Sequence, residues 1–307
     1  MSRLRLASLR PGSRWWERRW CDPRERARDL VRLGSISRRT ALAAVDHDCL
    51  NVAQSAAYSA MIGIFPALIV AAAVAPLLPY TVPMRFQLAH FFDRVLPPDV
   101  TPLLQTYFAT NPKNPQSTRA IVIAALVSVT GASSVIATLM EGLRRAHNLP
   151  MDCWTFWQRR RRAFVLVPLS LVPFGVASLL VVFGHLLTQF IAVHAGHVVR
   201  VPVYVVAMVM RWVIALLGSV GVIGLIYHMG TPIRQSWHRT LPGAIVATAM
   251  WFVSTLVFGW YVTRFANYSQ VYGSLGAGIA LLFWLYIISL SVLCGAEFNA
   301  QFFRDRN

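Results

Sequence analysis

Carboxylate and histidine side chains are the groups from which a hydrolytic or nucleolytic site would be built, and this sequence holds few of them. It has 12 Asp and Glu and 8 His among 307 residues, against 29 Lys and Arg. A metal-dependent nuclease or hydrolase needs several such groups that converge on one point. Asp46, His47 and Asp48 form the only acid–histidine cluster. Because consecutive residues at a helix start point in different directions, we interpret Asp46 or Asp48 as a helix N-cap.

Short catalytic and metal-binding motifs are also absent from the sequence. It contains no HxHxDH, HExxH, GxSxG or Walker A pattern. Its four cysteines form no CxxC pair, which argues against a zinc site and against a disulfide framework. We therefore predict that the protein is not an enzyme and that it has no catalytic residue, no metal site and no cofactor.

Arg211 is a charged residue at or inside a long apolar stretch. A charged side chain at the centre of a membrane span costs about 2.5–3.5 kcal/mol on insertion scales, so it usually faces a cavity or a partner. Arg211 would then bind an anionic head group or solute. Alternatively, the span begins at Trp212 and Arg211 reaches the outer interface. Pro66 interrupts another apolar stretch, where a kink shapes either a binding cavity or ordinary helix packing.

Glu297 is the one acidic residue in the last long apolar stretch. An unpaired carboxylate is costly in lipid, so we expect the Glu297 side chain to turn inward and to meet a base. The candidate partners are Arg144, Arg145 and Arg239.

Two apolar stretches carry small residues at helical spacing. These residues are Ala53, Ala56, Ala57, Ala60 and Gly63 in the first stretch and Gly273, Gly276, Ala277 and Ala280 in the last. A face of small residues lets a neighbouring backbone approach closely. We therefore expect the last helix to lie in the centre of the bundle.

The apolar residues fall in blocks of membrane-spanning length, and these blocks determine the expected architecture. Hydrophobic residues make up 56% of the chain and charged residues 13%. About 20 helical residues cross a hydrocarbon core, and lipid leaves helices as the way to satisfy the backbone here. The sequence predicts an all-α polytopic membrane domain at residues 46–302 with six transmembrane helices. The spans are placed near residues 50–79, 119–140, 163–191, 202–228, 241–263 and 273–300.

The arginine distribution predicts how these spans are oriented. Of the 29 basic residues, 22 lie in segments on one side of the predicted membrane and six on the other. Because basic residues near span ends stay in the cytoplasm, both termini should be cytoplasmic. The same distribution accounts for most of the net charge of +17, so we expect anionic lipids at the cytoplasmic face as partners and no nucleic acid.

Three further segments lie outside the predicted spans. Residues 1–45 form a basic cytoplasmic segment with interleaved tryptophans, which either lies on an anionic membrane surface or is a solvated tail. The external loop at residues 80–118 contains an amphipathic pattern over residues 84–96, typical of an interfacial helix. Residues 303–307 form a short cytoplasmic tail.

Several short residue blocks follow one another through the predicted spans. The blocks are Ala56–Ser59 with Phe65-Pro66, Leu225–Tyr227 with Pro232, Leu241–Ala244, Tyr272–Gly276, Trp284–Tyr286 and Gly295–Asn299. Together they resemble the YihY/BrkB family of bacterial inner-membrane proteins over residues 45–302. Asn148 resembles a Leu-Asn position of that family, although the order here is His147-Asn148-Leu149.

The resemblance implies a multi-pass protein of the bacterial inner membrane with six transmembrane helices and cytoplasmic termini. We take Arg211, Tyr58, Pro66, Tyr272 and Glu297 as candidate ligand or pathway residues. A second set comprises candidate helix-packing and family-motif residues. These are Gly63, Asn148, Tyr227, Pro232, Pro242, Gly243, Gly273, Gly276, Gly295 and Asn299.

The resemblance does not imply a settled activity. Members of the family have carried ribonuclease BN and serum-resistance labels, and some are discussed as exporters of lipids or other envelope components. Our first hypothesis is a non-enzymatic transport or envelope-maintenance protein for an anionic amphiphile or solute. A scaffold that docks anionic lipid or a partner is the alternative, and a membrane-bound tRNA-processing ribonuclease is a more remote one. The sequence leaves open whether the chain forms a homo-oligomer.

Overall fold

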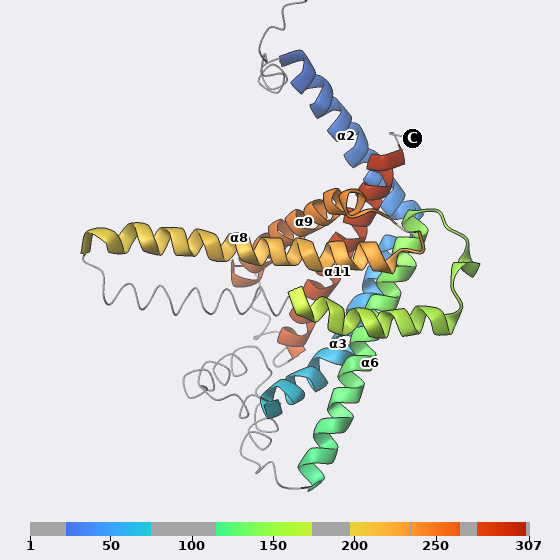
Figure 1. Cartoon of the computed structure of the whole chain (residues 1–307), viewed down its shortest axis with the longest axis vertical. Coiled ribbons are helices and arrows are strands. Elements are labelled where there is room, and N and C mark those ends of the chain that lie inside the picture. The colour runs from blue at the N-terminus through green and yellow to red at the C-terminus, as the bar shows by residue number, and fades with distance from the viewer. Residues whose placement is uncertain (1–22, 75–114, 174–196, 234, 265–274, 305–307) are drawn as a thin grey trace, which may run out of the picture.

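The computed structural model describes residues 23–74, 115–173, 197–233, 235–264 and 275–304, and every regular element within these residues is a helix (Figure 1). The predicted all-α class is therefore confirmed for the described part of the chain. The long helices are α2 (Pro23–Asp46), α3 (Cys49–Val74), α6 (Pro115–Ala146), α8 (His197–Gly230), α9 (Trp237–Arg264) and α11 (Leu275–Arg304). A 3₁₀ turn, η2 (Met151–Cys153), precedes a further helix over residues 156–173.

Within the described residues, five helices are long and apolar enough to cross a membrane, judged by length and composition. The candidate spans are Cys49–Val70, Thr118–Ala146, Met208–Gly230, Trp237–Val262 and Gly278–Phe303. Each overlaps one of the six spans predicted from the sequence. The remaining one, residues 163–191, lies partly outside the described residues, and the helix over 156–173 covers its first part. The six-span count and the side on which the termini lie stay predictions, and the loop at 80–114 is outside the described residues.

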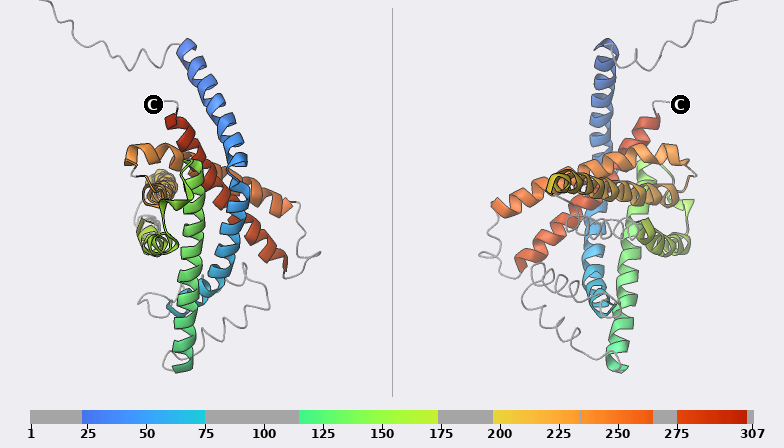
Figure 2. Two further views of the ribbon diagram at one scale, coloured as in Figure 1. Left: turned by 90° about the vertical axis from the view of Figure 1, so that its right-hand side faces the viewer. Right: turned by 60° about the vertical axis from the view of Figure 1, so that its left-hand side comes forward.

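α3 and α6 run side by side, as Figures 1 and 2 show from different directions. A glycine pair lets their backbones meet, since a Cβ added to Gly131 would lie 2.7 Å from the Cα of Gly63. Both α8 and the helix over 156–173 cross α6 at a steep angle (Figure 1). A small apolar cluster that includes Met140, Ala163 and Leu166 holds the second of these crossings.

α11 is the central helix of the described structure, because it contacts α2, α3, α6 and α9. The central position predicted for the last helix is thus confirmed. Its backbone lies close to that of α9, where a Cβ on Gly243 would lie 2.5 Å from the Gly295 carbonyl oxygen. Gly276 near the start of α11 is buried, and Gly273 lies outside the described residues.

The second half of α2 packs against α11, which corrects our expectation for this part of residues 1–45 alone. We expected this segment to be either a surface-lying strip or a solvated tail. Instead, Ile36, Thr40, Ala43 and Ala44 of α2 are buried, and α2 contacts α11. An apolar face at helical spacing explains the docking, while the first turns of α2 project beyond the other helices (Figure 1). Residues 1–22 lie outside the described residues.

Candidate functional site

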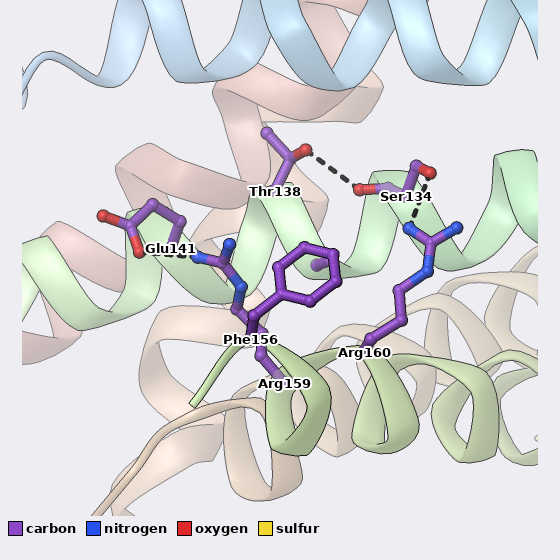
Figure 3. Close-up of a pocket in the computed structure, with 7 residues that line it drawn as sticks. Ser134, Thr138, Glu141, Phe156, Arg159 and Arg160 are labelled. Carbon is purple, nitrogen blue, oxygen red and sulfur yellow. Dashed lines mark hydrogen bonds and ion pairs between the residues drawn. The ribbon is translucent and has the colours of Figure 1, made fainter. Parts of the chain in front are cut away.

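A polar cavity of about 270 Å³ lies between α6 and the start of the helix over residues 156–173 (Figure 3). We call it the arginine pocket. It is lined by Ser134, Ala137, Thr138 and Glu141 of α6 and by Phe156, Arg159 and Arg160 of the facing helix. The α6 residues recur at spacings of three and four, which places them on one face of that helix.

Glu141 is surrounded by three arginines at one end of the arginine pocket. Its carboxylate accepts hydrogen bonds from Arg144 Nη2 at 2.6 Å, Arg159 Nη1 at 3.1 Å and Arg145 Nε at 3.4 Å. Arg144 also donates to the Leu149 carbonyl oxygen, which holds the chain after α6. One negative charge therefore faces three positive charges, and the local balance remains cationic.

Arg160 lies at the other end of the pocket and contacts neutral groups. Its Nη1 donates to Ser134 Oγ at 2.9 Å (Figure 3). Its Nη2 donates to the Thr130 carbonyl oxygen at 3.3 Å. Its guanidinium also lies over the Phe164 ring, 5.1 Å from the ring centre. Among the described residues, no carboxylate forms an ion pair with Arg160. The pocket thus presents a guanidinium that lacks an acidic partner within this part of the chain.

A second polar contact connects α6 to the turn between α2 and α3. Arg145 Nη1 lies 3.3 Å from Asp48 Oδ2, and the Asn51 amide donates to Asp48 Oδ1 at 2.6 Å. Asp48 has φ of 62°, a left-handed conformation that asparagine and aspartate tolerate better than most residues. Asp48 directly precedes α3, whereas Asp46 is the last residue of α2. Asp46 therefore cannot cap the first span.

Glu297 of α11 is fully buried beneath this turn and meets a histidine. The Glu297 Oε1 atom lies 2.7 Å from His47 Nδ1, and the Cys49 thiol donates to the same oxygen at 3.7 Å. His47 Nε2 in turn lies 3.2 Å from the amide oxygen of Asn148. Asn148 also has a left-handed backbone, with φ of 53°. Segments 100 and 250 residues apart in sequence thus meet at one imidazole ring.

The predicted arginine partners of Glu297 were wrong. Arg144 and Arg145 bind Glu141, and Arg239 lies over the Phe303 ring at 5.8 Å. The docking of α2 on α11 explains the difference, since it carries His47 across the end of α11. A sequence separation of 250 residues offers no periodic signal for such a contact.

The other candidate ligand residues are spread over the chain. Tyr58 is exposed on α3, and Pro66 lies inside that helix. Gly63 and Ala67 beside Pro66 line a separate apolar groove of about 350 Å³ between α3, α6 and neighbouring helices. Arg211 is the fourth residue of the candidate span Met208–Gly230, but its side chain is outside the described part, as is the whole of Tyr272. The structure therefore describes Tyr58, Pro66 and Glu297 among the five candidates, and the grouping of all five stays a prediction.

Four of the candidate packing residues converge on the end of α11 that carries Glu297, namely Tyr227, Gly243, Gly295 and Asn299. Tyr227 donates a hydrogen bond to the Val292 carbonyl oxygen, and Asn299 Oδ1 accepts one from the Gly243 amide at 3.3 Å. Pro242 lies in the second turn of α9, and Pro232 lies in the connection that leads to that helix. These contacts hold α8, α9 and α11 together.

Sequence reasoning missed His47, Arg159 and Arg160 as members of a polar site. The run Arg159 to Arg162 was visible, but it was used only to orient the spans. Four adjacent arginines on one helix point around its whole circumference, so some of them must face a neighbouring element. Within the described residues, no group of three or more His, Cys, Asp or Glu side chains could hold a metal ion.

Comparison with known proteins gives a consistent picture. A family model described as virulence factor BrkB matches residues 41–307. A UPF0761 membrane protein of Tolumonas auensis is 30% identical over 257 residues, covering 83% of this chain and 81% of that protein. UPF0761 membrane protein RSc1559 of Ralstonia nicotianae is 27% identical over 271 residues, covering 85% of this chain and 57% of its own length.

A putative ribonuclease-like protein, YfkH of Bacillus subtilis, is 28% identical over 185 residues, covering 58% of this chain and 63% of that protein. The chain therefore spans less than two thirds of the length of the Bacillus and Ralstonia relatives. No solved structure matches the chain.

Proposed function

The chain belongs to the virulence factor BrkB family, a family of multi-pass inner-membrane proteins, and on that premise we propose that it is a non-enzymatic transport or envelope-maintenance protein. Its substrate is an anionic amphiphile or solute, and the anionic group binds in the arginine pocket. Three arginines surround one carboxylate there, and a fourth, Arg160, has only neutral partners among the described residues. This excess of guanidinium groups is the observation that carries the proposal.

The chemistry of the pocket favours a phosphate or carboxylate group. A guanidinium presents two parallel N–H donors to such groups, and charge-assisted bonds are stronger than neutral ones. Ser134 and Thr138 add hydroxyl groups, and Phe156 supplies an apolar wall. A cavity of about 270 Å³ accommodates a head group rather than a whole lipid, so the acyl chains of an amphiphile would stay in the bilayer.

Reconstitution into liposomes tests this function directly. Purified protein is tested with a panel of fluorescent phosphatidylglycerol, other envelope lipids and anionic solutes, and transfer across the bilayer is measured. Removal of a charge-assisted hydrogen bond costs about 1.5–3 kcal/mol, so Arg160→Gln should lower the transfer rate about tenfold or more. Arg161→Gln is the matched control, because Arg161 is exposed and lies outside the pocket lining. Absence of transfer for every lipid and solute by the wild type would refute the proposal.

Docking of anionic lipid or a protein partner is a second function, favoured by α2. This helix carries six arginines, its second half is anchored on α11, and its first turns project from the rest (Figure 2). Binding to anionic vesicles that depends on residues 1–45, without any transfer activity, would favour this scaffold over a transporter.

The name of the Bacillus relative raises the ribonuclease alternative. In the described structure, however, the carboxylates of α6 and α11 are held by arginines and by His47 rather than grouped together. Cleavage of tRNA precursors by purified protein free of soluble nucleases, lost on Asp48→Ala, would support the ribonuclease and contradict our proposal.

A further inference from the structure

The buried pair formed by His47 and Glu297 lies outside the arginine pocket and has no role in anion binding. We infer that this pair is a proton-binding site and that its proton is the coupling ion of transport. The coupling part of this inference rests on the proposed function, whereas the proton site itself does not. In the net binding step, an O–H bond of a hydronium ion breaks, which leaves water, and an O–H bond forms at the Glu297 carboxylate.

The two oxygens of the Glu297 carboxylate differ in their hydrogen bonding. Oε1 contacts His47 Nδ1 and accepts a hydrogen bond from the Cys49 thiol. Oε2 is buried and has no hydrogen-bond partner among the described residues. A buried acceptor without a partner is costly, and protonation would remove the charge that makes it so. The geometry therefore presents Oε2 as the atom that takes up the proton.

His47 provides the route between this carboxylate and water. Its side chain is 18% exposed, whereas that of Glu297 is 0% exposed. The imidazole faces an oxygen at each ring nitrogen, Glu297 Oε1 at Nδ1 and Asn148 Oδ1 at Nε2. Each ring nitrogen can therefore share a hydrogen with an oxygen on its side of the ring. Such an imidazole can pass a proton inward from one nitrogen and regain one from the surface at the other.

Several titratable and charged groups surround Glu297, and they come from the turn before α3, from α3, from the end of α6 and from α11 itself. Besides His47, Cys49 faces it from the start of α3 and Cys294 from α11 itself. His147 acts on Glu297 electrostatically from the end of α6, and Arg145 acts on the neighbouring Cys49. His147 is itself bound to the Leu143 carbonyl oxygen and to Gln235. Within the described structure, His47 is therefore the only one of these groups that forms an ion pair with Glu297.

Three ion pairs in series lead to the arginine pocket from Asp48, the residue that follows His47. Asp48, adjacent to His47 in sequence, contacts Arg145, Arg145 contacts Glu141, and Glu141 contacts Arg159 of the pocket lining. A change of charge at Glu297 acts first on the turn that carries both His47 and Asp48. Arg145 of α6 contacts the same turn. Proton binding at Glu297 and anion binding in the arginine pocket therefore both change the position of this turn.

Infrared difference spectroscopy of the full chain in lipid nanodiscs tests the proton site without any substrate. Titration of the wild type should produce a carbonyl band of a protonated, buried carboxyl group, which Glu297→Gln removes and Glu141→Gln retains. His47→Gln keeps an amide donor toward Glu297 but cannot be charged, and it should move the pH at which the band appears by about one unit or more. A wild-type band that persists in Glu297→Gln, or no such band at all, would overturn the proton site.

The coupling is tested in the same liposomes that test the proposed function, with fluorescent phosphatidylglycerol and an imposed pH gradient. A gradient of one pH unit, about 1.4 kcal/mol, should change the wild-type rate by up to about tenfold. Glu297→Gln should transfer the lipid at a rate that does not depend on the pH gradient. Wild-type transfer that is insensitive to the gradient would refute the coupling alone. A lack of any transfer would refute the proposed function and the coupling, and the infrared result would still decide the proton site.

Discussion

Gly295 lies where α9 crosses α11, and substitution by alanine should expose how tightly these helices are packed. An added Cβ would lie 2.5 Å from the Cβ of Ala247, 2.6 Å from the Gly243 carbonyl oxygen and 2.7 Å from Tyr227 Oη. Carbon atoms in contact are separated by about 3.5–4.0 Å, so the helices must separate by roughly 1 Å. Displacement of Tyr227 would also disturb its hydrogen bond to the Val292 carbonyl oxygen.

The size of the effect follows from two opposing contributions. Overpacking of this kind costs about 1–3 kcal/mol, and the backbone carbonyl of Gly243 has little freedom to move aside. Alanine in place of glycine inside a helix returns about 0.5–1 kcal/mol. We expect Gly295→Ala to lower the free energy of unfolding by about 2 kcal/mol, or the melting temperature by roughly 4–8 °C.

Thermal unfolding of the purified protein in one detergent measures this effect, with Gly221→Ala as the control. Within the described part of the chain, no atom lies within 4 Å of a Cβ built at Gly221 of α8, so this variant should melt at or slightly above the wild-type temperature. If Gly295→Ala and Gly221→Ala melt alike, the close approach of α9 and α11 does not exist.

Three further predictions concern other parts of the chain. Glu297→Gln should keep the melting temperature close to that of the wild type, because an amide retains a polar contact with His47. Glu297→Leu should lower the melting temperature, because the leucine side chain leaves the His47 imidazole without a polar partner on that side. Gly276→Leu should prevent accumulation of folded protein in membranes, because Gly276 is buried, and wild-type expression would place this end of α11 at the periphery. A single cysteine at Ser117 should be labelled by a membrane-impermeant reagent from outside the cell, and labelling only from the cytoplasm would reverse the predicted topology.

Local composition was enough to predict the helical class and the position of most spans. A block of about 20 apolar residues can satisfy its backbone in lipid only within itself, so the information for each helix is local. Glycine and alanine at helical spacing likewise identify faces that admit a close neighbour. The crossing at Gly243 and Gly295 uses two residues that the sequence had already marked for packing.

The distant partners of charged residues, such as His47 for Glu297 and Arg159 for Glu141, were decided by the tertiary structure alone. Arg144, Arg145 and Arg239 could each have paired with the Glu297 carboxylate by charge. All three lie near helix ends, so their positions in the sequence did not show which of them would lie near Glu297. Only the docking of α2 on α11 carries His47 to the carboxylate, and only the crossing of α6 by residues 156–173 turns an arginine run into a pocket. Polar contacts across 100 to 250 residues leave no periodic pattern in the chain, because they depend on how whole helices cross rather than on which residues form them.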